Sequence, residues 1–555
     1  MMRRSSMSNR AIHRQRWRRG AVAATASLAL LLSACGNGEE ATDDADANGA
    51  ENGEQVSGGG TVTVYNCQPQ NLMPSNSTEV CGSWVLEQLF TGLTQVDYDT
   101  FEPVPGVATG WDSNEDQTVW TFEIGEGWSF HNGEEITAQT FVDTFNWTVD
   151  PENAQQNNDF YDVFVGYEDL VEGDADELEG VSAVDDYTLE LELNEPFSPL
   201  PMMLSYTGFY PMPQEAFDDP EAFEDAPIGN GRYQMDGEWE HDVQIAVERY
   251  EDWPGEDPGV PERIEWQIYS DIETAYLDVQ AGALDILDNV PPSRLGTMED
   301  DFGDDQALFE TSSFTYMGLP LYQEEFDDAD VRHALSMAID REEIIDSIFD
   351  GAQVPARNII PPMLPQARED ACEYCEFDPD AAAELYEEAD GPSELTVYFN
   401  SGAGHEDWVE AVSNQWQQHL GIEDVTFQSL EFAQYLDLHD DQSVTGPFRL
   451  GWVLSYPSPQ YAMEPIYTSG QSSNYTTFDN EEFDDLIAQA NASDPEEADE
   501  YYQQAEDILL EEMPVIPMWF QSMGVVHSDQ IEHDSVTMDP RTFLRVEQLQ
   551  VTDEE

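Results

Sequence analysis

Alternating and helical patterns of apolar residues divide most of the chain into short strands and helices. Residues 119–124 (VWTFEI) alternate between apolar and polar types, which predicts a half-buried strand. The glycine-rich stretch 125–133 favours a turn, and Thr137 occupies the N-cap of a predicted helix in which Phe141 and Phe145 are spaced i, i+4. This segment is therefore predicted to run strand, turn, helix.

The same patterns predict elements over most of the remaining chain. Strands are predicted at 61–65, 187–193, 264–269, 395–399 and 448–456, and an extended segment at 514–519. Helices are predicted at 84–90, from 274 (followed by a turn and a strand up to 287), from 331, and at 380–389, 408–420 and 506–513. The repeated alternation of strands and helices favours α/β lobes with mixed sheets.

The N-terminal residues have the pattern of a secretory signal. Seven arginines and no acid precede an apolar run at 21–32, which is too short for a permanent membrane span. Leu32-Ser33-Ala34-Cys35 resembles a lipobox, so Cys35 is predicted to be acylated after removal of 1–34; the alternative is a chance cysteine behind a signal peptide. A lipid anchor would hold a soluble domain at the membrane face.

The next segment, 35–59, is predicted to be a flexible acidic tether. It consists mainly of Gly, Asn, Ala, Asp and Glu, with too few apolar side chains to offset the entropy of ordering. Such a chain has a mean reach on the order of 27 Å.

The charge of the chain is strongly negative. It holds 117 Asp and Glu against 18 basic residues, all of them arginine, and seven of these precede Cys35. Nucleic acids and anionic membranes bind through basic contacts, so both are excluded as partners. We interpret the acids as a solvated shell of the kind found in proteins adapted to high salt. The alternative of many metal sites is disfavoured because no EF-hand spacing occurs, and no metal ligand is predicted.

Four cysteines remain after Cys35. An even number in a secreted chain indicates disulfides, and four cysteines can pair in three ways. We favour the local pairs Cys67 with Cys81 and Cys372 with Cys375 in an oxidising compartment. The second pair could instead be redox-active or half of a zinc site, but no second CxxC or neighbouring histidine pair completes such a site.

Motifs of catalysis are missing from the sequence. It contains no G-x-S-x-G, H-E-x-x-H or S-x-x-K, and the absence of lysine excludes Schiff-base and Walker chemistry. Gly229-x-Gly231 is not followed by the helix that a phosphate loop requires. His405-Glu406 resembles a catalytic dipeptide without partners. We therefore predict a protein that is not an enzyme and binds no cofactor.

Several longer motifs, in order along the chain, resemble those of one protein family. The motifs are VPGVA at 104–108, Trp111, WTF at 120–122, FHNG at 130–133, Thr137-Ala138, IGNGRY at 228–233, TAYLDVQAGALDIL at 274–287 and VRHALSMAIDREEI at 331–344. With these motifs the chain resembles the extracytoplasmic solute-binding proteins of peptide-type ABC transporters (family 5), and the resemblance covers roughly 60–550.

The resemblance implies a two-lobed, periplasmic-binding-protein-like α/β fold with mixed sheets, a hinge and an additional third domain. The expected division is the signal peptide at 1–34, the tether at 35–59, lobe I at 60–93, 200–305 and 515–555, the additional domain at 94–199, and lobe II at 306–514.

The resemblance also implies a ligand-binding strand at 449–457 (RLGWVLSYP). Gly451 would allow another backbone to approach closely, and Trp452 offers a flat apolar wall. Arg449 matches a position that reaches a peptide carboxylate in the family; the alternative is a structural ion pair among so many acids. Val453, Ser455 and Tyr456 belong to the same expected set.

Other expected ligand contacts come from separate parts of the chain. His405 and Phe432 match family pocket positions, although simple packing or surface exposure would explain either residue. Gln68 and Gln70 lie in the loop after the first strand, which faces the cleft in the family. Tyr316 completes the expected set.

One position departs from the family pattern. Peptide-binding members have Asp in a D-Y-P step, where it pairs with the α-ammonium of the ligand, and this chain has Ser455. A hydroxyl cannot make that charge-assisted contact. Either another acid replaces it, or the ligand has no free amino terminus at that point.

The expected function is that of a lipid-anchored, monomeric receptor subunit on the outer face of the cell membrane. It would close on an oligopeptide-like solute and deliver it to a permease, while partner subunits hydrolyse ATP. The alternatives are the same fold binding an oligosaccharide, opine or metal chelate, an envelope scaffold or sensor without transport, and a secreted hydrolase.

Overall fold

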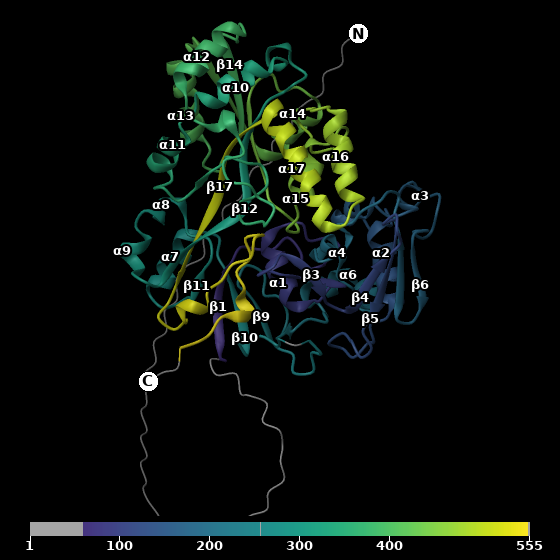
Figure 1. Cartoon of the computed structure of the whole chain (residues 1–555). Helices are drawn as coiled ribbons and strands as arrows, with labels where there is room; N and C mark the ends of the chain where they lie inside the picture. The colour runs from purple at the N-terminus through teal and green to yellow at the C-terminus, as the bar shows by residue number, and fades with distance from the viewer. Residues whose placement is uncertain (1–58, 256, 553–555) are drawn as a thin grey trace, which may run out of the picture. The chain divides into compact units, whose positions relative to one another are not determined.

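The computed structural model describes residues 59–255 and 257–552 (Figure 1). The predicted signal peptide, the lipidation site Cys35 and nearly all of the tether lie outside the described residues. Within the described ranges, no helix combines the length and apolar character needed to cross a membrane.

The described residues form a large mixed sheet of eleven strands. Its order is β15-β14-β16-β12-β17-β11-β1-β10-β9-β8, with β13 paired to β17. The strands are β1 (Thr61–Asn66), β8 (Tyr233–Met235), β9 (Gln244–Arg249), β10 (Arg263–Ile268), β11 (Ile286–Leu287), β12 (Gln306–Gly318), β13 (Val354–Pro355), β14 (Glu394–Asn400), β15 (Asp424–Leu430), β16 (Phe448–Trp452) and β17 (Val515–His527).

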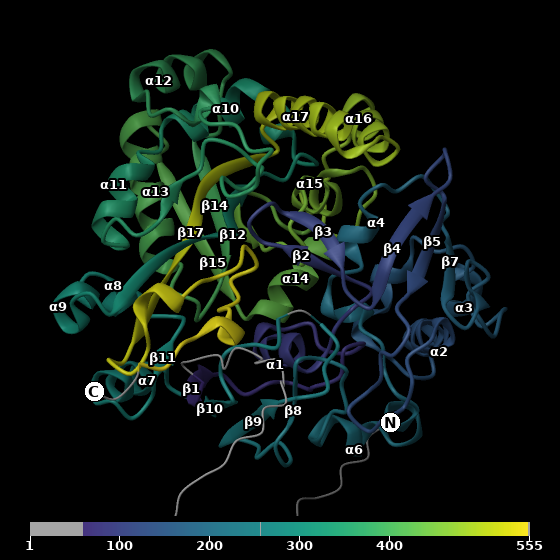
Figure 2. The ribbon, with the colours of Figure 1, turned by 60° about the horizontal axis from the view of Figure 1, so that its bottom comes forward.

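Two long strands connect the halves of this sheet. We call β11-β1-β10-β9-β8 the first half-sheet and β15-β14-β16 the second half-sheet. Strands β12 and β17, of 13 residues each, pair antiparallel between them (Figure 2). Their register shifts between Glu310 and Phe314. β17 pairs with β11 of the first half-sheet and β12 pairs with β16 of the second, so the two strands together join the halves.

A separate antiparallel sheet contains the strand of the segment predicted to run strand, turn, helix. Its order is β4-β5-β7-β6, and Phe141 and Phe145 of the adjacent helix α2 are fully buried. The Thr137 N–H donates to Thr140 Oγ1 at 3.1 Å at the start of α2, which confirms the predicted cap. The strands are β4 (Ala108–Ser113), β5 (Val119–Ile124), β6 (Val181–Asp185) and β7 (Thr188–Glu192), and β2 (Thr94–Asp97) pairs with β3 (Glu102–Pro105) beside them.

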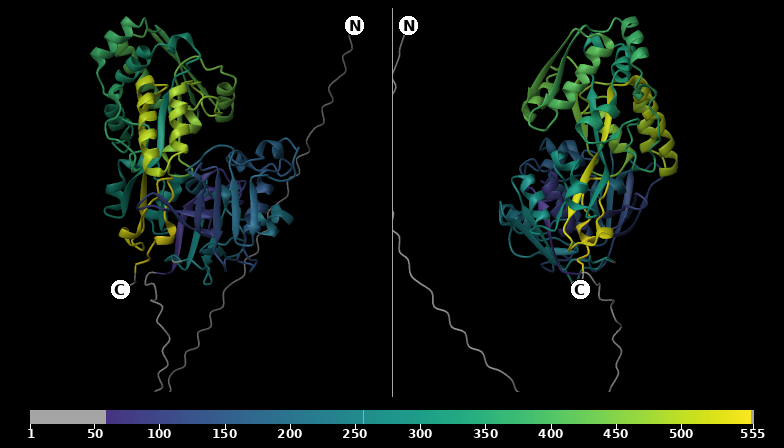
Figure 3. Two further views of the ribbon diagram at one scale, coloured as in Figure 1. Left: turned by 45° about the vertical axis from the view of Figure 1, so that its right-hand side comes forward. Right: turned by 90° about the vertical axis from the view of Figure 1, so that its left-hand side faces the viewer.

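Helices cover the sheets and bury distinct apolar cores (Figure 3). Trp408 and Trp416 of α13 are buried against the second half-sheet, and Trp266 is buried in the first. Each such side chain contributes roughly 1.5–3 kcal/mol or more through removal from water. The helices are α1 (Val80–Leu89), α2 (Ala138–Val149), α3 (Tyr167–Val171), α4 (Leu200–Met203), α5 (Gln214–Asp218), α6 (Pro220–Asp225), α7 (Ile272–Gln280), α8 (Pro292–Leu295), α9 (Met298–Phe302), α10 (Ala329–Met337), α11 (Arg341–Ile348), α12 (Pro379–Glu388), α13 (Glu406–Leu420), α14 (Phe432–Asp440), α15 (Pro459–Tyr467), α16 (Glu481–Asn491) and α17 (Pro495–Glu512).

Several predicted boundaries were wrong. The strand predicted at 448–456 ends at Trp452, because the chain then turns through a proline-rich segment into α15. Helix α17 begins at Pro495 rather than at 506, since Ala498 and Tyr502 continue its buried face toward the N-terminus. Helix α1 begins at Val80, where the Glu79 carboxylate accepts hydrogen bonds from two backbone N–H groups.

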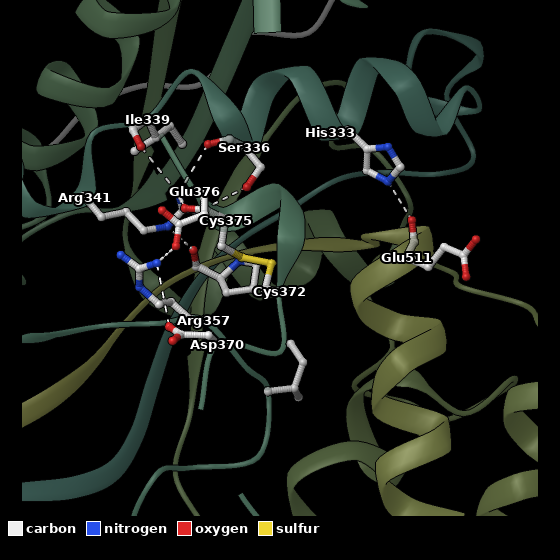
Figure 4. Close-up of a disulfide and its surroundings, with 12 residues drawn as sticks. His333, Ser336, Ile339, Arg341, Arg357, Asp370, Cys372, Cys375, Glu376 and Glu511 are labelled. Atoms are coloured by element: carbon white, nitrogen blue, oxygen red, sulfur yellow. Dashed lines mark hydrogen bonds and ion pairs between the residues drawn. A yellow bond between two sulfur atoms is a disulfide. The ribbon is translucent and has the colours of Figure 1, made fainter. Parts of the chain in front are cut away.

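Both local disulfides are present, which confirms the predicted pairing. Cys67–Cys81 links the loop after β1 to α1. Cys372–Cys375 is buried, and Figure 4 shows it beside Arg341, which donates to the Cys375 carbonyl at 2.9 Å. Because its sulfur atoms are packed in the core, this pair stabilises the fold rather than forming an exposed redox site.

Candidate ligand-binding site

Arg449 lies in the middle of β16 and its guanidinium has few partners. Strand pairing places it opposite Met317 of β12, and the end of β14 brings Asn400 beside it. One terminal nitrogen donates to Asn400 Oδ1 at 3.3 Å, while the buried Nε has no hydrogen-bond partner. Among the described residues no carboxylate pairs with this side chain, so a charged fork is left open to another anion.

This arrangement excludes the structural ion pair that we considered for Arg449. Apart from Arg341, which donates only to carbonyl and hydroxyl oxygens, the other arginines of the described ranges do pair with acids. They are Arg232, Arg249, Arg263, Arg294, Arg332, Arg357, Arg368, Arg541 and Arg545.

Burial perturbs the Arg449 charge without removing it. Withdrawal from water lowers the pKa of the guanidinium, while the nearby hydroxyls of Tyr435 and Tyr316 act in the opposite direction. An arginine starts from a pKa above about 12, so this side chain stays charged at neutral pH. A partly desolvated cation without a counter-ion favours the binding of an anion.

Gly451 leaves space on the Arg449 side of the strand. A Cβ at this position would lie 2.9 Å from the Phe314 carbonyl oxygen and 3.5 Å from a terminal nitrogen of Arg449. Residues i and i+2 of a strand point to the same face. A side chain at 451 would therefore compete with the guanidinium for this space.

His405 provides a second unpartnered group near Arg449. Its Nδ1 accepts a hydrogen bond from Trp408 Nε1 at 3.3 Å, and its buried Nε2 has no partner among the residues that the structure describes. Burial, and then the charge of Arg449, lower the pKa of His405 to about 3. The imidazole is neutral at pH 7, and since Nδ1 accepts, the hydrogen resides on Nε2. His405 thus adds a neutral donor to the charged donors of Arg449.

Two tyrosines and one asparagine hold the Arg449 strand in place. The Tyr435 hydroxyl donates to the Arg449 carbonyl at 2.7 Å, and Tyr316 is buried in β12 opposite Leu450. Tyr316, an expected ligand contact, thus lies on the strand beside Arg449, and its contact with a ligand stays a prediction. Sequence analysis did not identify Asn400 or Tyr435, because both reach this position through sheet register and helix packing rather than through a local motif.

Trp452, Ser455 and Tyr456 converge on Tyr461 of α15. Trp452 Nε1 donates to the Tyr461 carbonyl at 2.8 Å, and the Ser455 hydroxyl donates to the Tyr461 hydroxyl at 3.1 Å. Tyr456 is buried, and its ring centroid lies 4.6 Å from that of Tyr461. A cavity of about 450 Å³ lies beside this group. These expected residues therefore form an aromatic wall, with Tyr461 as a member that the sequence motif did not identify.

Four of the expected ligand contacts belong neither to the group around Arg449 nor to the aromatic wall. Val453 and Phe432 expose 43% and 48% of their surface. Gln68 and Gln70 are exposed in the loop after β1, where Gln68 Oε1 accepts from the Asp242 N–H at 2.7 Å. Their assignment as ligand contacts stays a prediction, because none of their hydrogen bonds joins them to Arg449 or Trp452.

Among the described residues, no three His, Cys, Asp or Glu side chains are grouped so that they could hold a metal ion. The arrangement is one of donors, aromatic walls and a cavity, which suits reversible binding.

Comparisons with known proteins show what this chain is similar to. The family model of bacterial extracellular solute-binding proteins, family 5, matches residues 102–474. The oligopeptide-binding protein OppA of Bacillus subtilis is 27% identical over 91% of this chain and 94% of its own length. The dipeptide-binding protein DppE of the same organism is 26% identical over 91% and 95%.

The fold agrees as well. The solved structure of the unliganded, open form of the murein tripeptide-binding protein MppA matches with a TM-score of 0.77 at 23% identity, covering 89% of this chain and 98% of that one. The predicted α/β fold with mixed sheets and a third domain is thereby confirmed, as is the prediction of a protein that is not an enzyme. The chain belongs to the bacterial extracellular solute-binding proteins of family 5.

Proposed function

We propose that this chain is the receptor subunit of an ABC importer, which captures a peptide-like solute and delivers it to a membrane permease. The names of two relatives, an oligopeptide-binding and a dipeptide-binding protein, support a peptide ligand. Hydrolysis of ATP would occur in partner subunits. The predicted acylation of Cys35 and the acidic tether at 35–59 would keep the receptor at the extracytoplasmic face of the cell membrane.

Capture would occur between two lobes. The proposed lobe I comprises 60–93, 200–305 and 515–555, the additional domain 94–199, and lobe II 306–514. The crossing strands β12 and β17 support this division, since they connect the two half-sheets. Arg449 and Trp452 belong to lobe II and Gln68 to lobe I, so closure would bring contributions from both lobes onto one solute.

The observation that supports a peptide-like ligand most directly is the unpaired guanidinium of Arg449. In a chain with 117 acids, a cation without a carboxylate partner is unusual, and its donors match the geometry of a carboxylate. The neutral His405 beside it could donate to the same oxygen atoms. A peptide C-terminus provides this carboxylate whatever its side chains, which suits a receptor of broad specificity.

The test compares free and amidated peptides on the mature chain, residues 35–555. Native mass spectrometry and thermal melts with a tripeptide library should show binding of free acids, weakened by about tenfold or more in C-terminal amides. Arg449→Met should weaken the free acids to the level of the amides. Arg249→Met is the matched control, because Arg249 lies in β9 of the first half-sheet. No rise in melting temperature with any peptide would contradict the proposal.

A second candidate is a non-peptide solute that also bears a carboxylate, such as an opine or a metal chelate. Ser455 favours it, because this residue cannot pair with a peptide α-ammonium as the Asp of peptide-binding members does. The same melts with opines, chelates and oligosaccharides distinguish the two candidates.

A further inference from the structure

The cavity beside Trp452 has an unusual combination of walls. It lies between residues 159–203 and the segment from Trp452 to Asn491, with a volume of about 450 Å³. Its lining contains no arginine, lysine or histidine among the described residues. The aromatic members are Phe160, Phe197, Trp452, Tyr456 and Tyr461, and the acidic members are Asp159, Asp162, Glu195 and Glu464.

The aromatic wall is preorganised by ring packing. The Tyr461 ring lies 5.5 Å from Trp452 and stacks with Phe160 at 6.1 Å between centroids. The Tyr461 carbonyl accepts from Trp452 Nε1, which fixes the position of the indole. Ring faces attract cations through the π-system, most strongly when water is excluded. A cavity of this volume is large enough for a side chain or the end of a small solute.

Glu464 holds a carboxylate at this wall without a cationic partner. It lies three residues after Tyr461 in α15, so both side chains are on the same face of the helix. One of its oxygens, Oε2, accepts from Gln460 Nε2 at 2.8 Å and from Asn491 Nδ2 at 2.9 Å. Within the described part of the chain, no arginine or histidine pairs with it. Neutral amides therefore orient the carboxylate and leave its charge uncompensated.

Asp162 faces the same cavity from the other side. Partial withdrawal from water, followed by the charges of Glu464 and Asp159, raises the pKa of Asp162 to about 6. Burial, and to a lesser degree the charge of Glu195, raise the pKa of Glu464. Two elements far apart in the sequence thus present like charges to one cavity, and a bound cation would relieve their repulsion.

We propose that this cavity receives the cationic group of the bound solute, an ammonium or a guanidinium, between the carboxylates of Glu464 and Asp162 and the rings of Tyr461 and Trp452. This inference rests on the proposed function, and it assigns the acid that replaces the family's Asp at Ser455. The Ser455 hydroxyl donates to the Tyr461 hydroxyl, so the substituted position borders the new site.

The proposal also gives the solute a charge pattern. Arg449 precedes Trp452 by three residues in β16, which is roughly 10 Å along a strand. Because residues three apart in a strand point to opposite faces, the guanidinium and the indole lie on opposite faces of β16, and one solute would contact both only by passing the end of the strand. A solute with a carboxylate at one end and a cationic group farther along would satisfy both.

Two probes that are not peptides test the cavity itself. Benzylamine and benzyl alcohol have the same ring but differ in charge, and ligand-observed NMR on the mature chain reports their binding. Benzylamine should bind at least about tenfold more tightly than benzyl alcohol, and Glu464→Gln should remove this preference. Asp162→Asn should weaken it by a smaller factor. Glu482→Gln, which removes an exposed acid of α16, is the matched control and should change nothing.

Equal binding of the two probes, no binding of either, or an unchanged preference in Glu464→Gln would overturn the proposal. Tri-alanine, N-acetyl-tri-alanine and N-acetyl-Ala-Lys-Ala then identify the source of the cation. Tight binding of the first alone indicates the α-ammonium, and recovery with the third indicates a side chain. If wild type binds benzylamine but no peptide, the proposed function alone is contradicted. If wild type and Glu464→Gln bind peptides equally well, the cation site alone is contradicted.

Discussion

Two arginines of this acidic chain are withdrawn from water but differ in their partners among the described residues: Arg541 pairs with acids, and Arg449 does not. Arg541 is 5% exposed and donates to Asp539 and to Glu87, the latter at 2.7 Å, and it also contacts the Tyr98 hydroxyl. Arg449 is half-buried and, within the described part of the chain, donates only to the Asn400 amide oxygen, at 3.3 Å. The first arginine joins α1, the segment after β2 and the C-terminal segment into one charge network, whereas the second joins nothing by charge.

The difference separates a structural cation from the cation that we propose binds the solute. Removing one member of a compensated buried network leaves the others unpaired, which costs more than the network itself contributes. Removing an uncompensated cation leaves no orphaned carboxylate behind. The stability of the unliganded protein should therefore depend on Arg541 and not on Arg449, and solute binding should depend on Arg449.

The largest expected effect is that of Arg541→Met. The substitution leaves the buried Asp539 and the half-buried Glu87 without this cation, so the free energy of unfolding should fall by about 3–5 kcal/mol. Denaturant unfolding of the mature chain measures this change. Arg545→Met, which removes a neighbouring and less buried arginine, is the control and should cost less. Equal losses for the two variants would show that the network around Arg541 is not special.

The next largest change in stability is expected at Asp288, a buried acid that no arginine of the described residues pairs with. It is 1% exposed, its Oδ1 has no partner, and burial raises its pKa to about 7. An unfolded Asp has a pKa near 4, so the folded state binds the proton more tightly and loses stability as the pH rises from about 4 to 7. Asp288→Asn should therefore be more stable than wild type by up to about 4 kcal/mol at pH 8 and equal to it below pH 4.

Unfolding curves of wild type and Asp288→Asn at several pH values between 4 and 8 measure this difference. Asp300→Asn removes an exposed acid of α9 and controls for the loss of one negative charge. A stability difference that stays constant with pH would contradict the assignment to Asp288.

A smaller change of opposite sign to that of Arg541 is expected for Arg449→Met. Burial lowers the pKa of Arg449, which means that its charge destabilises the unliganded fold. A methionine of similar length should raise the free energy of unfolding by about 1 kcal/mol, measured without ligand. A clear loss of stability would show that Arg449 has a structural role after all.

The sharpest test of the comparison is Asn400→Asp, whose expected effect on stability is as small as that of Arg449→Met. It places a carboxylate of nearly the same shape beside Arg449 and makes this site resemble that of Arg541. The unliganded fold should gain about 1 kcal/mol, while binding of free-acid peptides should weaken by about tenfold because the guanidinium is already paired. Unchanged peptide affinity would place the solute carboxylate elsewhere.

Sequence reasoning succeeded where the information is local. The strand and helix around Thr137 follow from alternation and capping within some thirty residues, and the Cys372–Cys375 pair is three residues apart. The position of Arg449 came from a motif. Its partner Asn400, 49 residues away, is brought to it only by the parallel neighbours β14 and β16.

The acids of the cavity could not be predicted either, because they too are brought together only by the fold. Asp162 and Glu464 are separated by about three hundred residues and are two among 117 acids, so composition conceals them. Only the packing of residues 159–203 against α15 distinguishes them from the solvated acids. The predicted end of β16 at 456 was wrong because the alternation of apolar and polar residues continues past Trp452, whereas the backbone leaves the sheet there.

The shift in register between Glu310 and Phe314 has a mechanical consequence. A continuous antiparallel ladder resists bending, whereas a bulge interrupts its hydrogen bonds and allows the strands to bend locally. Because β12 and β17 join the two half-sheets, a change in the angle between the half-sheets costs least where the ladder is already broken. The closure that we propose would thus be a flexing of two paired strands, with each half-sheet moving as a rigid body.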